Sequence, residues 1–577
     1  MAPGRSSHAF RPLSQRRFHR RHASLYSGSP DMAAPRRMRY QTWDLEPMRP
    51  GTTIFASLCA LLALPPARAG EPPIATVTVT ARKEPVVKKL DRTVYDVSSM
   101  ARAANGTAQD VLQATPEVSV TADGHIAVKG NAQVTVLVDG KPTAALSGDE
   151  RAVALQTMSG ADIASVEVIT NPSAAQQANG GAIVNIVLKR DRKPGARAQL
   201  RGSAADQGLW NAAASGDMTT KDLSVHGSLA YRHDGTRKSR RSAVDRHDPL
   251  SGESGQTLQA SEVFVRRIVQ NAALGVDYTL SETDSVSLSA RHDERRSRPL
   301  LDTLNMVRTG AGDTIYHRIS HGPNEQSDDS ASLAYTHRGR GTALKATVQR
   351  SRTNGLVDKS YQDVFVAPLR AAGYGRGATR SARRLDQATL DWSRRSEHGQ
   401  WGMGLDLQDE VIDLANYQAA VDPATGVEAP DADTTNAYAV TTRLAAAWLT
   451  RQITHSQWQV LLGGRFERMA LRVGPAQGSA LARHWQAFNP SLHVKYAITG
   501  KADLTLAYRR SLQRPDPRDL NPFTTYVDAQ NLSRGNPGLD PQRLTAWEIG
   551  TDAAGDHLNG SLGAFHRVSR STVTDAR

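Results

Sequence analysis

The sequence predicts two successive domains, an α+β domain near the N-terminus and then an antiparallel transmembrane β-barrel. Three observations predict this arrangement: an export signal, mixed helix and strand patterns at 85–193, and alternation of apolar and polar residues from residue 197 onward. The chain has 577 residues. That is too many for one compact soluble domain, so at least two units are expected.

A secretory signal peptide is predicted at residues 48–69. Met48 and Arg49 give a short basic start, residues 54–64 form an apolar run, and residues 67–69 read Ala-Arg-Ala, the small-residue pattern of a cleavage site. Cleavage after Ala69 removes Cys59, the only cysteine. The mature chain then needs no disulfide bond and offers no thiolate metal site.

Residues 1–47 are expected to be a non-native leader. They are rich in Arg, Ser, Pro and His, show no periodicity, and precede a signal peptide whose own start fits Met48 or, alternatively, Met38. His19 and His22 lie in this leader. We interpret their spacing as incidental and not as a metal site.

The net charge of +14 invites a nucleic-acid interpretation. Eleven arginines and three acidic residues fall within residues 1–69, so more than half of the net charge belongs to a segment that the mature protein loses. The remaining chain is only mildly basic. This distribution argues against a nucleic-acid partner.

Directly after the signal peptide, residues 74–81 form an uncharged segment rich in β-branched residues. It fits either the first strand of the next domain or a free extended segment, whose bare N–H and C=O groups pair with the edge of a partner's sheet. Its position at the new N-terminus favours the second interpretation. The segment comprises Ile74, Ala75, Thr76, Val77, Thr78, Val79, Thr80 and Ala81.

Residues 85–193 combine helical and strand signals. Thr107 is placed to cap a helix that stops before Pro116. Residues 134–138 are almost entirely apolar, as in a strand covered on both faces, and Asp139-Gly140 then makes a tight turn. These patterns predict a small α+β domain.

From residue 197 the period changes to two. Segments of about ten residues alternate outward apolar with inward polar side chains, as at 223–232, 286–291, 492–498 and 504–509. We count about eighteen such strands up to residue 568. A soluble sandwich shares this alternation, but the export signal favours a membrane barrel.

Four long polar segments are expected to be loops, at 234–256, 291–301, 367–383 and 421–435. Several aromatic residues near strand ends fit interfacial girdles, and core packing is an equal alternative for each of them. They are Tyr231, Tyr278, Trp401, Trp448, Tyr496 and Tyr508.

The α+β domain resembles the plug domain of TonB-dependent outer-membrane receptors. The resemblance rests on ATPEV at 114–118, VLVDGKP at 136–142, VEVITNPS at 166–173 and GGAIVNIVLK at 180–189. In the family a Gly usually stands where Glu117 stands here, a departure that touches one turn. The resemblance implies a plug at 85–193, a TonB box at 74–81 and an outer-membrane β-barrel at 197–577.

A later block is also similar to the barrels of this family. It comprises RP at 514–515, LNP at 520–522 and GNPGLDP at 535–541, and Gln542 replaces the family's usual Glu. The family's barrels have 22 strands and continue beyond this block to a terminal aromatic residue, whereas this chain ends TDAR at 574–577. We therefore expect a truncated reading frame and an incomplete barrel. If the family's 22-strand architecture applies, the sheet does not close; the alternative is that the roughly eighteen strands close as a smaller even-numbered barrel.

No catalytic constellation emerges from the sequence. A Gly-x-Ser-x-Gly elbow, a P-loop, Cys-x-x-Cys and His-Glu-x-x-His are all absent. We expect no enzyme, no cofactor and no metal site. His292 with Asp293 and Glu294 fits an acid–base cluster, but a solvated loop or strand end explains it better.

Basic residues on the predicted inward face of the barrel fit two roles. They attract an anionic ligand into the confined lumen, or they pair with carboxylates of the plug and barrel. The sequence leaves both roles open for Arg232, Arg291 and Arg509.

The resemblance implies a receptor in the bacterial outer membrane that imports a scarce solute by energy-coupled opening of the plug. The implied partners are TonB with its inner-membrane energising complex, outer-membrane lipid and a small-molecule ligand, for which a ferric siderophore is the commonest class. No residue is singled out for binding it. The alternatives are a structural or adhesin-type barrel with a vestigial plug, a non-functional truncated receptor, and a soluble nucleic-acid binder, against which the charge distribution and signal peptide count.

Overall fold

The computed structural model describes residues 86–100, 106–121, 125–147, 151–176, 179, 181–189, 194–247, 254–475, 480–528, 531–554 and 559–570. All of them belong to one compact unit. The leader with His19 and His22, the signal peptide and residues 74–81 lie outside the described residues, so the expectations for them remain predictions. Within the described ranges, no helix is long and apolar enough to cross a membrane.

The N-terminal domain is built on a five-stranded sheet. Its order is β1 (Val86–Lys88), β2 (Thr93–Asp96), β6 (Ile163–Ile169), β7 (Ala182–Leu188) and β5 (Val134–Val138). β5 runs parallel to β7, and the other pairs are antiparallel. A hairpin of β3 (Val118–Val120) and β4 (Ile126–Val128), the helices α2 (Ala108–Ala114) and α3 (Arg151–Thr157), and the short helices η2 (Val97–Ser99), η4 (Ala144–Leu146) and η5 (Gly160–Asp162) complete it.

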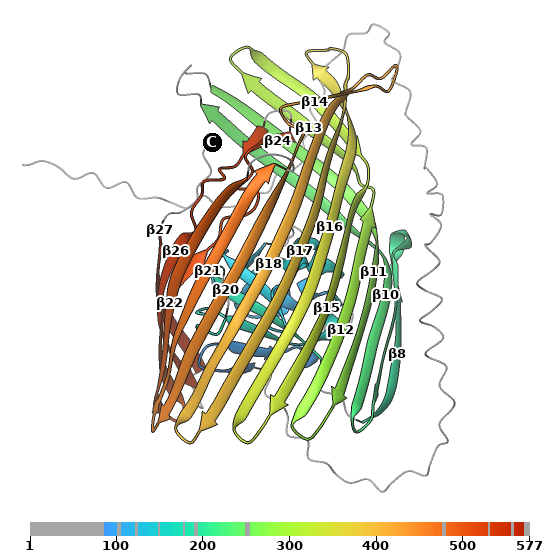
Figure 1. Ribbon diagram of the computed structural model, residues 1–577. Helices are drawn as coiled ribbons and strands as arrows, with labels where there is room; N and C mark the ends of the chain where they lie inside the picture. The colour runs from blue at the N-terminus through green and yellow to red at the C-terminus, as the bar shows by residue number, and fades with distance from the viewer. Residues whose placement is uncertain are drawn as a thin grey trace, which may run out of the picture. The chain divides into compact units, whose positions relative to one another are not determined.

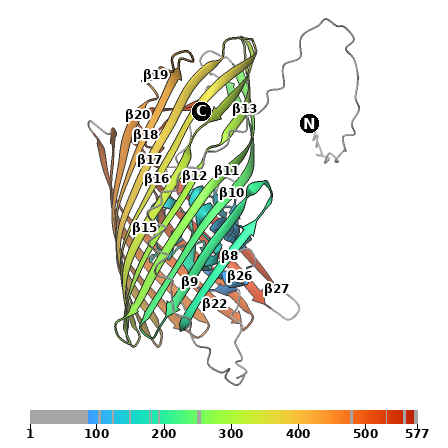
Figure 2. The ribbon, with the colours of Figure 1, turned by 90° about the vertical axis from the view of Figure 1, so that its right-hand side faces the viewer.

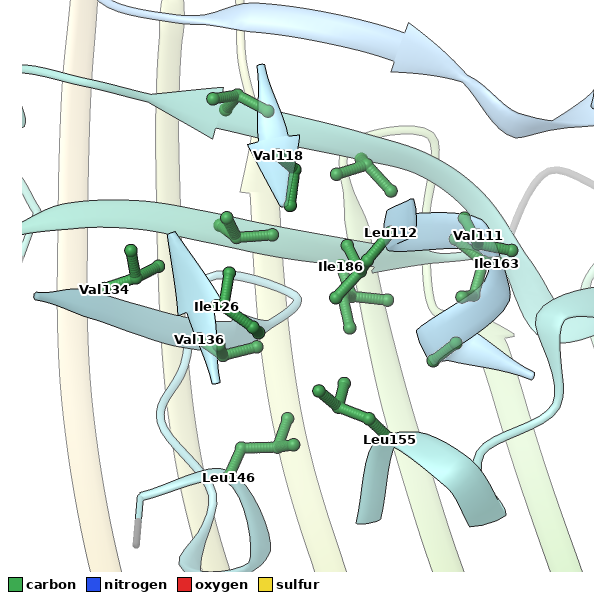
Figure 3. Close-up of a cluster of buried hydrophobic side chains, with 14 of the residues drawn as sticks. Val111, Leu112, Val118, Ile126, Val134, Val136, Leu146, Leu155, Ile163 and Ile186 are labelled. Carbon is green, nitrogen blue, oxygen red and sulfur yellow. The ribbon is translucent and has the colours of Figure 1, made fainter. Parts of the chain in front are cut away.

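The core of this domain lies between the sheet, the hairpin and the two helices. Leu112 of α2 and Leu155 of α3 are fully buried together with Ile163 and Ile186 of the sheet (Figure 3). Burial of one such side chain contributes about 1.5–3 kcal/mol. The domain therefore carries its own apolar core instead of depending on the barrel for one.

Local signals in this domain are confirmed. Thr107 caps α2 in a capping box: its hydroxyl accepts from the Asp110 N–H, and the Asp110 carboxylate accepts from the Thr107 N–H. The helix ends before Pro116 as predicted. Asp139 and Gly140 both have positive φ, 51° and 81°, as a two-residue hairpin turn requires.

Within the described ranges, eighteen strands form the second sheet, and their number agrees with the count from the sequence. They are β8 (Gly195–Ala204), β9 (Trp210–Thr219), β10 (Leu223–His247), β11 (Ser254–Thr279), β12 (Asp284–Ser297), β13 (Leu300–Thr309), β14 (Gly312–His321), β15 (Asn324–Arg338), β16 (Thr342–Ala367), β17 (Gly373–Ser396), β18 (Gly399–Val421), β19 (Glu428–Pro430), β20 (Asn436–His455), β21 (Trp458–Pro475), β22 (Leu481–Thr499), β23 (Ala502–Gln513), β26 (Gln542–Ala554) and β27 (Asn559–Arg570).

The strands surround the N-terminal domain, whose blue and cyan elements lie inside the wall in Figures 1 and 2. At one end the strands are joined by short turns, only two residues long between β17 and β18, β20 and β21, and β22 and β23. The other end carries the long connections. In the family's layout, this second end faces outside the cell.

The wall is extended at the end with the long connections. β12 pairs with β15, while the hairpin of β13 and β14 continues the sheet beyond them by pairing with β11 and β16. β24 (Thr524–Asp528) and β25 (Asn531–Arg534) form a separate hairpin between β23 and β26. The wall therefore projects well past the level of the short strands.

The strand order is that of a closed barrel, with β27 beside β8. Paired registers run from β8–β9 to β26–β27, but no register joins β27 to β8 among the described residues. β8 is exposed along almost its whole length, and so is β27 from residue 560 onward. The expectation of a sheet that does not close is therefore wrong, because the eighteen strands of the described residues close into a ring, although β27 and β8 share no extended ladder.

The expected loops are wrong in large part. β10 and β11 extend through most of 234–256, β12 and β13 cover most of 291–301, β17 begins within 367–383, and β19 lies within 421–435. Backbone ladders do not depend on side-chain polarity, so strands continue beyond the apolar belt into charged sequence. Polar sequence is therefore no sign that strand pairing ends.

The aromatic residues divide between the two alternatives. Tyr231 stacks on Trp210, while Tyr496 packs against Trp458 and Tyr508 against Trp547 with tilted rings; the ring centroids are 4.2–5.3 Å apart. Tyr278 and Trp401 are exposed. Trp448 instead lines a small cavity beside Arg92 of the N-terminal domain, so it belongs to the packed interior.

Candidate functional site

A cavity of about 460 Å³, called the upper cavity below, lies between the N-terminal domain and the wall, on the side of the long connections. The N-terminal domain supplies Arg151 and residues 132–137, and the wall supplies Arg383, Glu410 and Leu471. The guanidinium of Arg383 is buried and lies 3.5 Å from the carboxylate of Glu410. A cavity of this size fits a small molecule, and its charged groups fit a polar one.

Residues 514–528 and 531–541 form a lobe over this cavity, and they contain the later block of sequence similarity. Leu520 is 1% exposed and packs with Leu414, Tyr438 and Val440 of β18 and β20. A Cβ on Gly535 would lie 2.4 Å from the Asp519 carbonyl oxygen, so this position requires glycine. The block therefore folds the lobe and brings Arg514 to the cavity.

A second cavity of about 680 Å³, called the lower cavity below, lies on the side of the short turns. It is bounded by α3, by β7 and by the wall strands β8 to β12, β15 and β16. Its lining carries both charges, including Asp162, Lys189, Arg291, Asp293 and Lys345. Such a lining suits water and charged solutes.

The N-terminal domain touches the wall at several polar contacts. The backbone N–H of Ala144 donates to Ser351 Oγ at 3.0 Å, and the N–H of Ala174 donates to Ser491 Oγ at the same distance. His493 Nε2 lies 2.7 Å from the Asn171 carbonyl oxygen. Most of the contacts are single hydrogen bonds, which contribute about 0.5–1.5 kcal/mol each.

A buried ionic network ties the N-terminal domain together. Arg92 contacts Asp91 at 2.8 Å and Glu167 at 3.0 Å, and Glu167 accepts from Asn185 Nδ2 at 2.8 Å. Burial by itself raises the pKa of the Asp91 carboxyl, but the hydrogen bonds and charge of Arg92 outweigh it and lower the pKa to about 2. Asp91 is therefore ionised at neutral pH.

The three inward arginines do not converge on the upper cavity. Arg232 donates to the Gln156 carbonyl oxygen at 2.6 Å, Arg291 pairs with Asp293 at 2.6 Å, and Arg509 donates to Ser511 Oγ at 3.0 Å. Arg291 lines the second cavity, together with its partner. Two of the three bond to barrel residues and one to the N-terminal domain, so structural roles describe them better than anion capture does.

The acidic cluster after His292 is divided by the strand pleat. His292 pairs with Asp329 across the outer face at 2.7 Å, Glu294 pairs with Arg296 at 2.6 Å, and Asp293 faces inward toward Arg291. These groups cannot act on one substrate. Among the residues that the structure describes, no group of three or more His, Cys, Asp or Glu is arranged to hold a metal ion.

The sequence interpretation missed the arginines of the upper cavity, Arg151, Arg383 and Arg514. The sequence contains one signal. Arg383 shares one face of its strand with Leu385 and Gln387, whereas Arg384 shares the other face with Asp386 and Ala388. Only the register shows which of these two sets faces inward.

Two family models match the chain. The TonB-dependent Receptor Plug Domain matches residues 89–183, and the Outer membrane protein beta-barrel family matches residues 336–576. No curated protein matches the chain. The first match covers the N-terminal domain, and the second covers the wall from the end of β15 onward.

Solved structures share the fold at low identity. The copper transporter OprC is 14% identical with a TM-score of 0.58, over 83% of this chain and 71% of that chain. A mutant of the ferric enterobactin receptor PfeA from Pseudomonas aeruginosa is 16% identical with a TM-score of 0.55, over 84% and 73%. The unliganded ferric citrate transporter FecA is 15% identical with a TM-score of 0.51, over 82% and 69%.

The two family models agree with this architecture. The first coincides with the five-stranded domain inside the wall, and the second with the long antiparallel strands around it. The chain therefore belongs to the TonB-dependent receptors of the bacterial outer membrane, β-barrels with an N-terminal plug that are transport receptors and not enzymes.

Proposed function

We propose that the protein imports a scarce solute through the outer membrane by energy-coupled opening of its plug. The observation that carries this proposal is the upper cavity, because plug and barrel residues line it together. Any movement of the plug then changes the binding site. A surface site on the barrel alone would not couple binding to plug movement.

Residues 74–81 are proposed as the segment that TonB pulls. They precede β1, which lies at the edge of the plug sheet and is exposed along its length. Among the described residues, β1 pairs with β2 alone, through three residue pairs. TonB would add a strand to 74–81 and transmit force to this edge. Because an edge strand with three pairs is weakly held, it is the part of the sheet that force detaches first.

The solute is proposed to be a ferric siderophore. Two of the solved relatives are named for ferric citrate and ferric enterobactin, and the upper cavity offers Arg151, Arg383 and Arg514. Guanidinium groups bind the oxygen atoms of anionic chelates through paired, charge-assisted hydrogen bonds. A copper complex is the second candidate, because another relative is named a copper transporter.

Uptake measurements test this proposal. A strain without its own iron receptors would express the chain and receive radiolabelled iron bound to citrate, to a catecholate or to a hydroxamate, with labelled copper in parallel. We expect uptake of at least one iron chelate. Uptake of none, with the protein folded in the outer membrane, would favour the structural or adhesin-type barrel.

A matched pair of variants tests the site itself. Arg383→Ala removes a cavity guanidinium, whereas Arg384→Ala removes its neighbour on the outer face of β17. We expect Arg383→Ala to weaken binding of the transported chelate by about tenfold or more, as for loss of a charge-assisted hydrogen bond. Arg384→Ala should leave binding unchanged, and equal effects would place the site elsewhere.

A further inference from the structure

One short segment of the plug, residues 141–147, separates the two cavities. Pro142 and Ser147 line the upper cavity, Lys141, Thr143 and Ala145 line the lower one, and Leu146 borders both. Leu146 is 2% exposed. Because neighbouring residues of the segment face opposite cavities, the segment is the partition between them.

The barrel wall shows the same boundary. Ser351 of β16 lines the lower cavity, and Leu385, its register partner on β17, lines the upper one. The two cavities therefore approach each other across a single ladder pair. Only the partition segment and its contacts with β16 and β17 keep them apart at this point.

Three residues of the partition make polar contacts with the wall. The Ala144 N–H donates to Ser351 Oγ at 3.0 Å, and Gln349 Nε2 donates to the Pro142 carbonyl oxygen at 3.1 Å. Lys141 contacts Thr389 and lies 3.7 Å from Asp391. These polar contacts break and re-form by exchange with water, whereas Ala144 and Leu146 of the partition are buried, so the pull on the plug must supply the free energy of moving them.

The ends of the partition are fixed within the plug. The Gly140 N–H donates to Asn185 Oδ1 at 2.7 Å, and Arg151 Nε donates to the Leu146 carbonyl oxygen at 3.2 Å. The opposite side of the plug is held separately on β22 by Ala174 with Ser491 and by Asn171 with His493. The middle of the partition can therefore move while the rest of the plug stays attached.

We propose that residues 141–147 are the gate of the transport route, and that their displacement from β16 and β17 joins the upper cavity to the lower one. The lower cavity then serves as a transit site for the polar solute on the side of the short turns. This inference rests on the proposed import function, and it adds the route. The plug need not leave the barrel.

Disulfide locks test the route, because Cys59 is the only cysteine of the chain. The gate lock joins Ala144→Cys to Ser351→Cys. The control lock joins Ala174→Cys to Ser491→Cys, at a contact of the same type and length on the other side of the plug. We expect the oxidised gate lock to abolish uptake of the transported chelate, with recovery on reduction, and the control lock to leave uptake intact. Loss of uptake in both locks, or in neither, would overturn the gate.

A second measurement does not depend on the solute. Ser351→Ala and Ser491→Ala each remove one buried hydroxyl that accepts from a plug N–H. In planar bilayers with KCl, we expect Ser351→Ala to raise the open fraction of the purified protein about fivefold, as loss of one hydrogen bond implies. Ser491→Ala should match the parent chain. Equal conductance of the two variants would contradict the gate even if no chelate is transported, whereas a failure of uptake alone concerns the import function.

Discussion

Glu117 carries backbone strain where the family usually has glycine. Its φ of 69° lies in the left-handed region, in the turn between α2 and β3. The turn is nevertheless kept, because the Lys129 N–H donates to the Glu117 carbonyl oxygen at 3.0 Å and the Lys129 amine lies 3.5 Å from its carboxylate. The departure noted in the sequence thus leaves the fold intact at a cost in conformational energy.

Glu117→Gly should stabilise the plug by about 1 kcal/mol, because glycine adopts positive φ without a steric penalty. Urea-induced unfolding of the plug, followed at a reporter in its core, measures this change. Glu117→Gln serves as the control, since it removes the charge and keeps the strain. A gain in the glutamine variant equal to that in the glycine variant would assign the effect to the charge instead of the backbone.

Asp91 makes the stability of the plug dependent on pH. Its pKa of about 2 in the folded state lies below the value of about 3.9 in an unfolded chain. The ionised carboxylate therefore contributes about 2–3 kcal/mol at neutral pH, and most of this contribution is lost as the pH falls from 4 to 2. Asp91→Asn should be less stable than the parent at pH 7 and equal to it near pH 2. A difference that does not change with pH would rule out ionisation as the cause.

At the scale of elements, helices, turns and strands that depend on neighbouring residues were predicted correctly, whereas features that depend on distant residues were missed. The capped helix α2, the turn at Asp139 and the period-two strands follow from short-range patterns, and they were predicted. The extended hairpin of β13 and β14 was not predicted, because charged residues concealed its pairing. The upper cavity was also missed, since Arg383, Arg151 and Arg514 come together only through barrel register and plug docking.

The lobe of residues 514–541 is a separate element that depends on Leu520. This side chain is 1% exposed among the residues of β18, β20 and β21. Leu520→Ala should destabilise the docked lobe by about 2–5 kcal/mol, the range for truncating a buried leucine. We expect faster proteolytic cleavage within 514–541 at the cell surface, with the barrel itself intact. Unchanged cleavage would show that the lobe is held by its polar contacts.

At the scale of the whole molecule, the seam between β27 and β8 closes the ring but has the least extensive pairing among the described strands. The ladders on either side are registered residue by residue, whereas no register joins these two strands among the described residues. Unpaired backbone groups facing lipid cost several kcal/mol each. The wall should therefore open first at this edge.

Hydrogen exchange tests the edge directly. We expect the amides of β8 and β27 to exchange faster than those of β17 and β18, which are paired on both sides. The reason is that each edge strand has one registered neighbour. Exchange in β8 and β27 as slow as in β17 would mean that a stable ladder forms between them.

The central claim is that the protein is an importer driven by a pull on residues 74–81. Val77→Pro and Val79→Pro test it, because proline lacks an N–H donor and does not fit a paired central strand. The measurement is uptake of the transported chelate beside its binding at the cell surface. The account predicts that both variants bind as the parent does and transport nothing. Unchanged uptake in both would contradict it.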